Sequence, residues 1–192
     1  MIIDALTSSV NLIISQTKAN ANLLFTLISI PWLVFFVDKL VFHNRLLYLG
    51  IIPRHLSGLP GIIFSPFLHA DFNHIFFNTI PLIVLTDFLL INGLPYFLEV
   101  TLIIGIISGI LTWCFATPGI HVGASGLITG YWAFLVSDIV QQNSFTALIL
   151  GLLSLYYFVG IFFGIFPTKK GVSWEGHLFG LIGGLIANYL LV

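Results

Sequence analysis

Charged side chains are scarce in this sequence, since Asp, Glu, Lys and Arg make up only 7% of its 192 residues. An ordinary soluble domain carries roughly 25%. Six basic and seven acidic residues cannot cover a globular surface of this size with water-compatible groups. The net charge of −1 and the lack of a basic run give no sign of nucleic-acid binding. A soluble fold and a nucleic-acid partner are therefore excluded.

Cysteine and metal-binding motifs are also lacking. The single cysteine, Cys114, excludes a disulfide framework and any cysteine-based zinc or iron–sulfur centre. The absence of a His-Glu-x-x-His motif disfavours a zinc protease, and no paired intramembrane aspartates exist for an aspartyl mechanism. We therefore expect neither a metal nor a cofactor.

Apolar residues, in contrast, amount to 58% of the chain. Uncharged or nearly uncharged runs close to twenty residues long are typical of transmembrane helices. Such runs fall at about 19–41, 72–91, 95–115, 125–137, 144–166 and 174–192. The sequence predicts an all-α membrane protein whose single domain, residues 1–192, is a bundle of six transmembrane helices.

Two further segments are predicted to lie at the membrane surface. Residues 5–17 are apolar on one face and too short to span a bilayer, so 1–18 should form a short interfacial segment. Asp4 stands where a signal peptide would be basic, so no signal peptide is expected. The link 42–71 is long and partly apolar, which favours a first loop partly embedded in the membrane.

The predicted helix 125–137 is unusually short. Its thirteen residues extend about 20 Å, against a hydrocarbon core of about 30 Å. If Asp138 marks one membrane surface, Ser125 lies below the other, and residues 117–123 must enter the membrane as irregular backbone. Such backbone is tolerated only where protein covers it or where it lines a water-filled cavity. The sequence therefore predicts a buried aqueous pocket with Ser125 at its floor.

Polar side chains within the spans are costly and need a reason. His74 and Asn78 are four residues apart and thus share one helix face. Ser125 lies in Gly-Ala-Ser-Gly, and His177 lies in Gly-His-Leu-Phe-Gly near the start of the last span. These four side chains are the candidates for chemistry.

Small residues indicate how Ser125 and His177 could meet. Gly126 and Gly130 are spaced for close helix packing, and the last span offers Gly176, Gly180, Gly183, Gly184 and Ala187. Contact between these helices would bring the serine hydroxyl to the imidazole, the usual base for activating it.

No acidic residue is placed to complete a triad. Asp138 lies about 20 Å along the helix from Ser125, and Glu175 points to a different face from His177. The expected arrangement is a Ser–His dyad.

Three motifs together resemble the rhomboid family of intramembrane serine proteases. They are Gly-x-Ser-Gly at 123–126, Gly-His-x-x-Gly-x-x-x-Gly at 176–184, and His69-x4-His74-x3-Asn78. Their order and the six-span layout also agree, so the resemblance covers nearly the whole chain.

The resemblance implies a serine endopeptidase that cleaves transmembrane segments through an acyl-enzyme intermediate. Ser125 corresponds to the nucleophile and His177 to the general base. The side chains of Asn78 and His74, with the Ser125 backbone N–H, correspond to the oxyanion hole. The implied partners are transmembrane protein substrates and the lipid bilayer, and the implied location is the cell (inner) membrane as a multi-pass protein.

The resemblance also implies a mobile cap at 167–173 and a lateral gate in the span 144–166. Two positions depart from the family pattern. Residues 59–62 lack the Trp-Arg pair often found in the first loop, and Thr129 replaces a tyrosine that stacks on the base. Trp132 and Trp174 are the candidates to orient His177 instead.

Other interpretations of these residues stay open at this stage. Ser125 alone would fit a small residue that allows helix packing, and His177 alone would fit an interhelical hydrogen bond. His69 is interpreted as structural. His121 either lines the pocket entrance or, as is more common for a loop histidine, is merely exposed. The competing functions are an inactive rhomboid-like protein that binds or escorts transmembrane helices, and a small transporter or channel subunit.

Membrane orientation is also open. The first, third and fifth loops between the predicted spans, 42–71, 116–124 and 167–173, lie on the same side of the membrane. Five of the six basic residues lie on or beside these loops, namely Lys39, Arg45, Arg54, Lys169 and Lys170. The positive-inside tendency would place that face in the cytoplasm, whereas bacterial rhomboids typically open their site outward.

Overall fold

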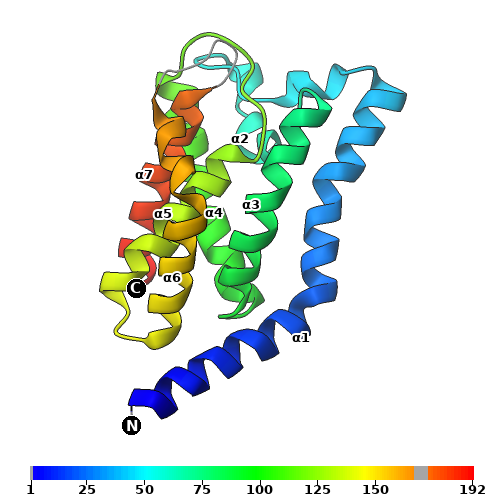
Figure 1. Ribbon diagram of the computed structural model, residues 1–192. Helices are drawn as coiled ribbons and strands as arrows, with labels where there is room; N and C mark the ends of the chain where they lie inside the picture. The colour runs from blue at the N-terminus through cyan, green and yellow to red at the C-terminus, as the bar shows by residue number, and fades with distance from the viewer. Residues whose placement is uncertain (1, 167–172) are drawn as a thin grey trace.

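The computed structural model describes residues 2–166 and 173–192, and within these ranges it contains helices and no strand. The long helices form an upright bundle (Figure 1). They are α1 (Ile2–Val37), α3 (Phe72–Leu90), α4 (Leu94–Phe115), α5 (Ser125–Gln141), α6 (Phe145–Phe158) and α7 (Trp174–Leu191). Short helical pieces extend or link them: η1 (Asp38–Phe42), η2 (Arg45–Leu49), η3 (Leu56–Gly58), α2 (Gly61–Phe64), η4 (Ser65–Phe67) and η5 (Val159–Ile165).

Helix α5 is the centre of the bundle. Eight consecutive residues, Ile128–Leu135, are buried, so this stretch of the helix has no face exposed to lipid or water. Its closest neighbour is α7. A Cβ atom on Gly180 would overlap the Gly126 carbonyl oxygen, and one on Gly184 would overlap that of Gly130. The backbone-to-backbone contact predicted from the small residues is therefore confirmed.

The end of α5 differs from the prediction, because the helix continues four residues past 137 to Gln141. Asp138 was expected to mark a membrane surface, yet its side chain is only 3% exposed. Its carboxylate accepts hydrogen bonds from Asn188 Nδ2 at 2.8 Å and Gln142 Nε2 at 3.0 Å. Because these amide donors offset the cost of burying the carboxylate, the helix can continue past Asp138 inside the bundle.

Helix α1 also differs from the prediction of a separate interfacial helix followed by a span. It runs without interruption from Ile2, bends, and lays its first part across the lower end of the bundle (Figure 1). Thr17 Oγ1 donates to Asp87 Oδ2 at 2.8 Å, and Asn20 Nδ2 donates to the Leu90 carbonyl at 3.0 Å. The sequence predicted a break in the helix between residues 18 and 19. These two hydrogen bonds instead anchor this part of α1 to α3. An interfacial position for residues 1–18 stays a prediction.

Four described helical segments are long and apolar enough to cross a membrane: Ile2–Phe42, Phe72–Leu90, Leu94–Phe115 and Phe145–Ile165. Helix α5 has 17 residues, and α7 carries Glu175, His177 and Asn188. The central pair is thus the more polar part of the bundle and the outer helices are the more apolar. The protein is a membrane protein, and the count of six spans stays a prediction.

The loop between α1 and α3 is anchored without the Trp-Arg pair at 59–62. Trp113 of α4 donates from Nε1 to the His55 carbonyl at 2.9 Å. Arg54 Nη1 donates to the Ala116 carbonyl at 2.8 Å, and Ile51 exchanges backbone hydrogen bonds with His121. The first loop is therefore tied to the end of α4 and to residues 116–124, which lead to Ser125.

Candidate active site

Ser125 is the first residue of α5, and the chain reaches it through a backbone turn that needs glycine. Gly123 has φ of 115°, a conformation rarely adopted by other residues, and its N–H donates to the Ser65 carbonyl at 2.9 Å. A Cβ atom at Gly123 would lie 2.5 Å from His74 Nε2. Glycine is thus required here both for the turn and for the approach of α3.

The four predicted site residues line one cavity. Its volume is about 490 Å³, and His74 and Asn78 of α3, Ser125 of α5 and His177 of α7 all contribute to its wall. Ser125 and His177 are held at this level by the contact between Gly126 and Gly180. No hydrogen bond joins the Ser125 hydroxyl to the His177 ring among the described residues.

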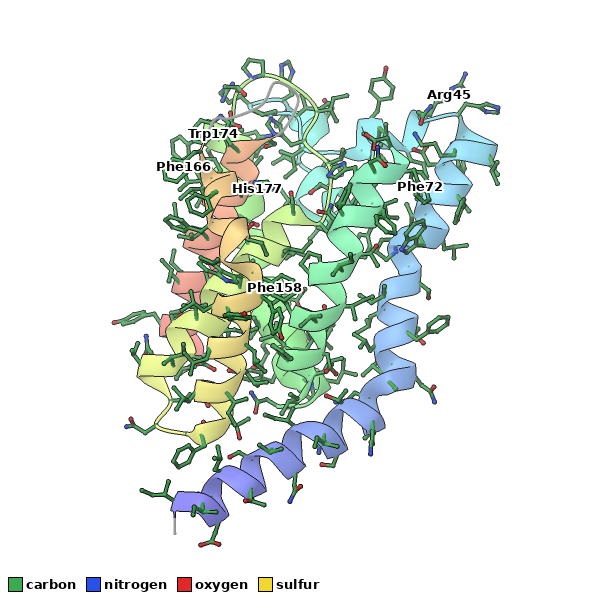
Figure 2. All side chains as sticks on the ribbon, viewed as in Figure 1. Arg45, Phe72, Phe158, Phe166, Trp174 and His177 are labelled. Atoms are coloured by element: carbon green, nitrogen blue, oxygen red, sulfur yellow. The ribbon has the colours of Figure 1, made fainter. Side chains whose placement is uncertain are left out.

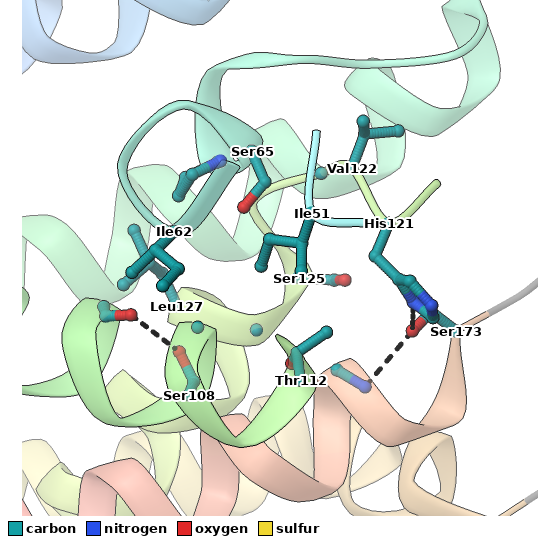
Figure 3. Close-up of a pocket in the computed structure, with 16 residues that line it drawn as sticks. Ile51, Ile62, Ser65, Ser108, Thr112, His121, Val122, Ser125, Leu127 and Ser173 are labelled. Carbon is teal, nitrogen blue, oxygen red and sulfur yellow. Dashed lines mark hydrogen bonds between the residues drawn. The ribbon is translucent and has the colours of Figure 1, made fainter. Parts of the chain in front are cut away.

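A second, smaller cavity of about 50 Å³ also reaches Ser125 (Figure 3). Its polar lining includes Ser65, Ser108 and Thr112, and Ser125 lies in its wall. A water molecule needs roughly 10–15 Å³ of such space and two to four polar partners. The predicted polar pocket at Ser125 is therefore present, with room for water next to the hydroxyl.

His177 is oriented by a main-chain group. Its Nδ1 lies 2.8 Å from the Gly164 carbonyl oxygen in η5. Trp132 instead donates from Nε1 to the Ser154 carbonyl at 3.1 Å, and no hydrogen bond or ring contact joins Trp174 to His177 among the described residues. His177 and Trp174 both lie toward the upper end of α7 (Figure 2). Neither tryptophan suggested by the sequence is the orienting group.

Asn78 presents an unsatisfied donor to the site. Its Nδ2 atom is buried and has no hydrogen-bond partner, and it lies 3.6 Å from the position of a Cβ on Gly123. A buried unpaired donor costs about 1–3 kcal/mol, so its retention needs an explanation. The Ser125 N–H is also free of intrahelical partners, because it is among the first four of α5. Both groups could bind an oxyanion at the serine.

His69 lies behind the site and is 2% exposed. Its Nε2 accepts a hydrogen bond from the Ala124 N–H at 3.5 Å, and its ring packs edge-to-face on His74 with centroids 5.0 Å apart. Burial, helped by the nearby His74, lowers the pKa of His69 from 6.5 to about 4. The structural role predicted for this histidine fits these contacts, which support the residue just before Ser125.

The buried neutral His69 predicts loss of stability in acid. Since its folded pKa of about 4 lies below the usual 6.5, its contribution is complete above pH 6.5 and declines as pH falls toward 4. The loss reaches about 3 kcal/mol at most, at 1.36 kcal/mol per pKa unit. Melting temperatures measured in detergent between pH 7 and pH 4 should fall less steeply for His69→Gln than for the wild type. The exposed His55→Gln is the control and should follow the wild-type curve.

A polar cluster at the cavity mouth was only partly anticipated from the sequence. His121 lines the cavity, the less common of its two interpretations, and its Nδ1 lies 2.7 Å from Ser173 Oγ, which also caps the start of α7 (Figure 3). Glu175 accepts hydrogen bonds from the N–H and the hydroxyl of Thr117. The cluster ties the loop before Ser125 to the helix that carries His177. The cap-forming Ser173-x-x-Gly176 pattern was the available signal.

Of the predicted mobile cap, 167–173, only Ser173 belongs to the described residues, and 167–172 lie outside them. The predicted lateral gate, 144–166, is divided in the structure. It is α-helical to Phe158 and continues as the 3₁₀-helix η5, which contains Gly160 and Gly164. Glycine is a weak α-helix former, and 3₁₀ turns are frequent at helix ends.

Comparison with known proteins agrees with this architecture. A family profile described as Rhomboid domain matches residues 57–192. The chain belongs to the rhomboid family. An uncharacterised protein of Mycobacterium tuberculosis (strain ATCC 25618 / H37Rv) is 39% identical over 177 residues, covering 88% of this rhomboid and 73% of the relative. One of Mycobacterium leprae (strain TN) is 37% identical over 178 residues, covering 88% and 70%.

A third relative carries a functional name. YdcA of Bacillus subtilis (strain 168), named as a candidate rhomboid protease, is 26% identical over 176 residues, covering 85% of this rhomboid and 84% of the relative. Family membership and this relative together support a protease that acts on membrane substrates.

Proposed function

We propose that this rhomboid is an intramembrane serine endopeptidase of the cell membrane that cleaves transmembrane segments. Ser125 is the nucleophile and His177 the general base. The observation that carries the proposal is the single cavity shared by Ser125, His177, His74 and Asn78. These residues come from three helices, and a shared polar cavity inside an apolar bundle is costly unless it serves a function.

The proposed first step is attack of Ser125 Oγ on the carbonyl carbon of the scissile peptide bond. His177 Nε2 takes the hydroxyl proton as the new C–O bond forms. Hydroxyl and imidazole are not hydrogen-bonded without substrate, and such contacts often tighten only in the substrate complex. His177 then gives the proton to the leaving amine, and the acyl group stays on Ser125.

The negative charge that develops on the substrate carbonyl oxygen needs donors. Asn78 Nδ2, the Ser125 N–H and the His74 ring are the groups available at the cavity wall. Donors fixed in a site that excludes bulk water stabilise a developing oxyanion more than water does, because they need no reorganisation. The unpaired Asn78 donor thus has a use in the transition state.

Hydrolysis of the acyl-enzyme completes the proposed cycle. Water held in the small cavity beside Ser125 attacks the ester carbonyl while His177 accepts its proton. The proton then returns to Ser125 Oγ as the ester bond breaks. The polar lining of that cavity supports water at a depth where the surrounding helices are apolar.

A serine-reactive fluorophosphonate probe tests this function on the full-length protein in detergent. Labelling of the wild type that is lost in Ser125→Ala and in His177→Ala supports the dyad. Well-folded wild-type protein that is neither labelled nor able to cleave a transmembrane substrate would instead support the binding or escort function.

Asn78→Ala is expected to lower kcat by about 10²–10³-fold, the usual cost of losing one oxyanion donor. KM should change little, because the lost hydrogen bond forms mainly in the transition state. Steady-state cleavage of a transmembrane substrate in proteoliposomes measures both constants. Asn73→Ala is a matched control, since Asn73 lines the same cavity but is exposed. Equal rates for the two variants would remove Asn78 from the mechanism.

A further inference from the structure

We propose that the main-chain carbonyl of Gly164 is the third member of the catalytic unit and that it positions His177 as an acid side chain would in a triad. This inference rests on the proposed function and adds a residue that the motifs do not contain. Gly164 does not touch the substrate and acts only through the histidine.

The contact determines which tautomer His177 adopts. The Gly164 oxygen lies 2.8 Å from Nδ1, and a carbonyl oxygen can only accept a hydrogen bond. The neutral ring must therefore carry its proton on Nδ1. Its Nε2 then keeps a lone pair, which is what a general base facing Ser125 requires.

The position of the carbonyl also favours the charged intermediate. Gly164 is the residue before the last in η5, and the final carbonyls of a helix lack intrahelical donors. The C-terminal end of a helix carries partial negative charge. It therefore stabilises the imidazolium that forms when His177 takes the serine proton.

Steric contacts explain why residue 164 is glycine. A Cβ atom there would lie 2.6 Å from His177 Nδ1 and 3.2 Å from Cε1, so a side chain would push the ring out of place. Gly160 belongs to the same 3₁₀-helix, yet a Cβ on it would have nothing within 4 Å. The requirement for glycine is thus specific to the residue under the ring.

No other described group performs this role. Thr129 occupies the position where the family often has a tyrosine, and its hydroxyl donates to the Ser125 carbonyl at 2.8 Å. Trp132 is engaged with Ser154. The Gly164 carbonyl makes the one hydrogen bond recorded for the His177 ring within residues 2–166 and 173–192.

The experiment compares Gly164→Ala with Gly160→Ala in the full-length protein. Gly164→Ala should lower kcat about 100-fold with KM nearly unchanged, the usual cost of misplacing a catalytic group by about 1 Å. Gly160→Ala should stay within about twofold of the wild type, because its added methyl meets open space. Equal kcat values for the two variants would overturn the inference.

The second measurement reads the tautomer directly in the wild type, so it holds even where Gly164→Ala fails to fold. ¹⁵N-histidine NMR, with the His177 signals assigned by their loss in His177→Asn, should show a protonated Nδ1 and an unprotonated Nε2. A neutral ring protonated on Nε2 would refute the contact. A wild type with the expected tautomer but no labelling or cleavage would refute the proposed function and leave the contact standing.

Discussion

Ser125→Ala is expected to lower the rate of substrate cleavage by about four to six orders of magnitude. Removal of the nucleophile of a serine protease eliminates the acyl-enzyme route, and the catalysis that remains comes from the oxyanion donors and binding alone. Substrate binding should persist, because the methyl group of alanine leaves the cavity wall otherwise intact. Cleavage assays in proteoliposomes, together with a binding measurement on the same variant, separate the two effects.

Ser137→Ala provides the matched control on the same helix. The Ser137 hydroxyl donates to the Ala133 and Phe134 carbonyls and is absent from the cavity wall. This variant should keep wild-type activity and should be labelled by the fluorophosphonate probe. Cleavage by Ser125→Ala at more than a few per cent of the wild-type rate would mean that another residue supplies the nucleophile.

The sequence was informative where a residue type allows only one environment. Glycines spaced along two spans predicted the contact between α5 and α7, because only glycine lets backbones come so close. The short distance from Ser125 to the next charge predicted irregular backbone above the serine, and Gly123 with its positive φ lies in that segment. Both inferences used steric or solvation limits that hold in any fold.

Charge was a poorer guide to where helices end. Asp138 was expected to mark a membrane surface, but its carboxylate is buried and accepts hydrogen bonds from the side-chain amides of Gln142, just after α5, and Asn188 of α7. Asn188, which supplies one of these amides, is 50 residues away in the sequence. Likewise, Thr17 and Asn20 anchor α1 through partners on α3. Contacts of this kind depend on the folded arrangement and leave no local pattern in the chain.

The support for His177 was beyond sequence reasoning for a different reason. Its partner is a backbone carbonyl, which every residue has, so no residue type indicates it. In the sequence, Gly160 and Gly164 have the four-residue spacing of packing glycines, which gives no hint of a role at the site. Its distinguishing property, the His177 ring at the place of its missing side chain, exists only in three dimensions. The sequence therefore predicted which side chains line the cavity and missed what orients one of them.

Gly180→Ala is expected to destabilise the bundle by about 3 kcal/mol or more and to abolish activity. Alanine normally stabilises a helix interior by about 1 kcal/mol relative to glycine. Here the added methyl would overlap the Gly126 carbonyl oxygen, and a backbone atom inside a central helix cannot move aside as a side-chain end can. The helices would have to separate, which would also part Ser125 from His177.

Gly105→Ala is the matched control, because here the same added methyl is expected not to destabilise the protein. Gly105 lies within α4, and the nearest neighbour of an added Cβ is the flexible end of Leu127 at 3.8 Å, an ordinary contact. That substitution should leave the melting temperature in detergent unchanged or slightly raised. Since both variants add one methyl to a helical glycine, opposite effects isolate the overlap with the Gly126 carbonyl. A Gly180→Ala protein as stable and active as Gly105→Ala would show that α5 and α7 do not pack as closely as the contact requires.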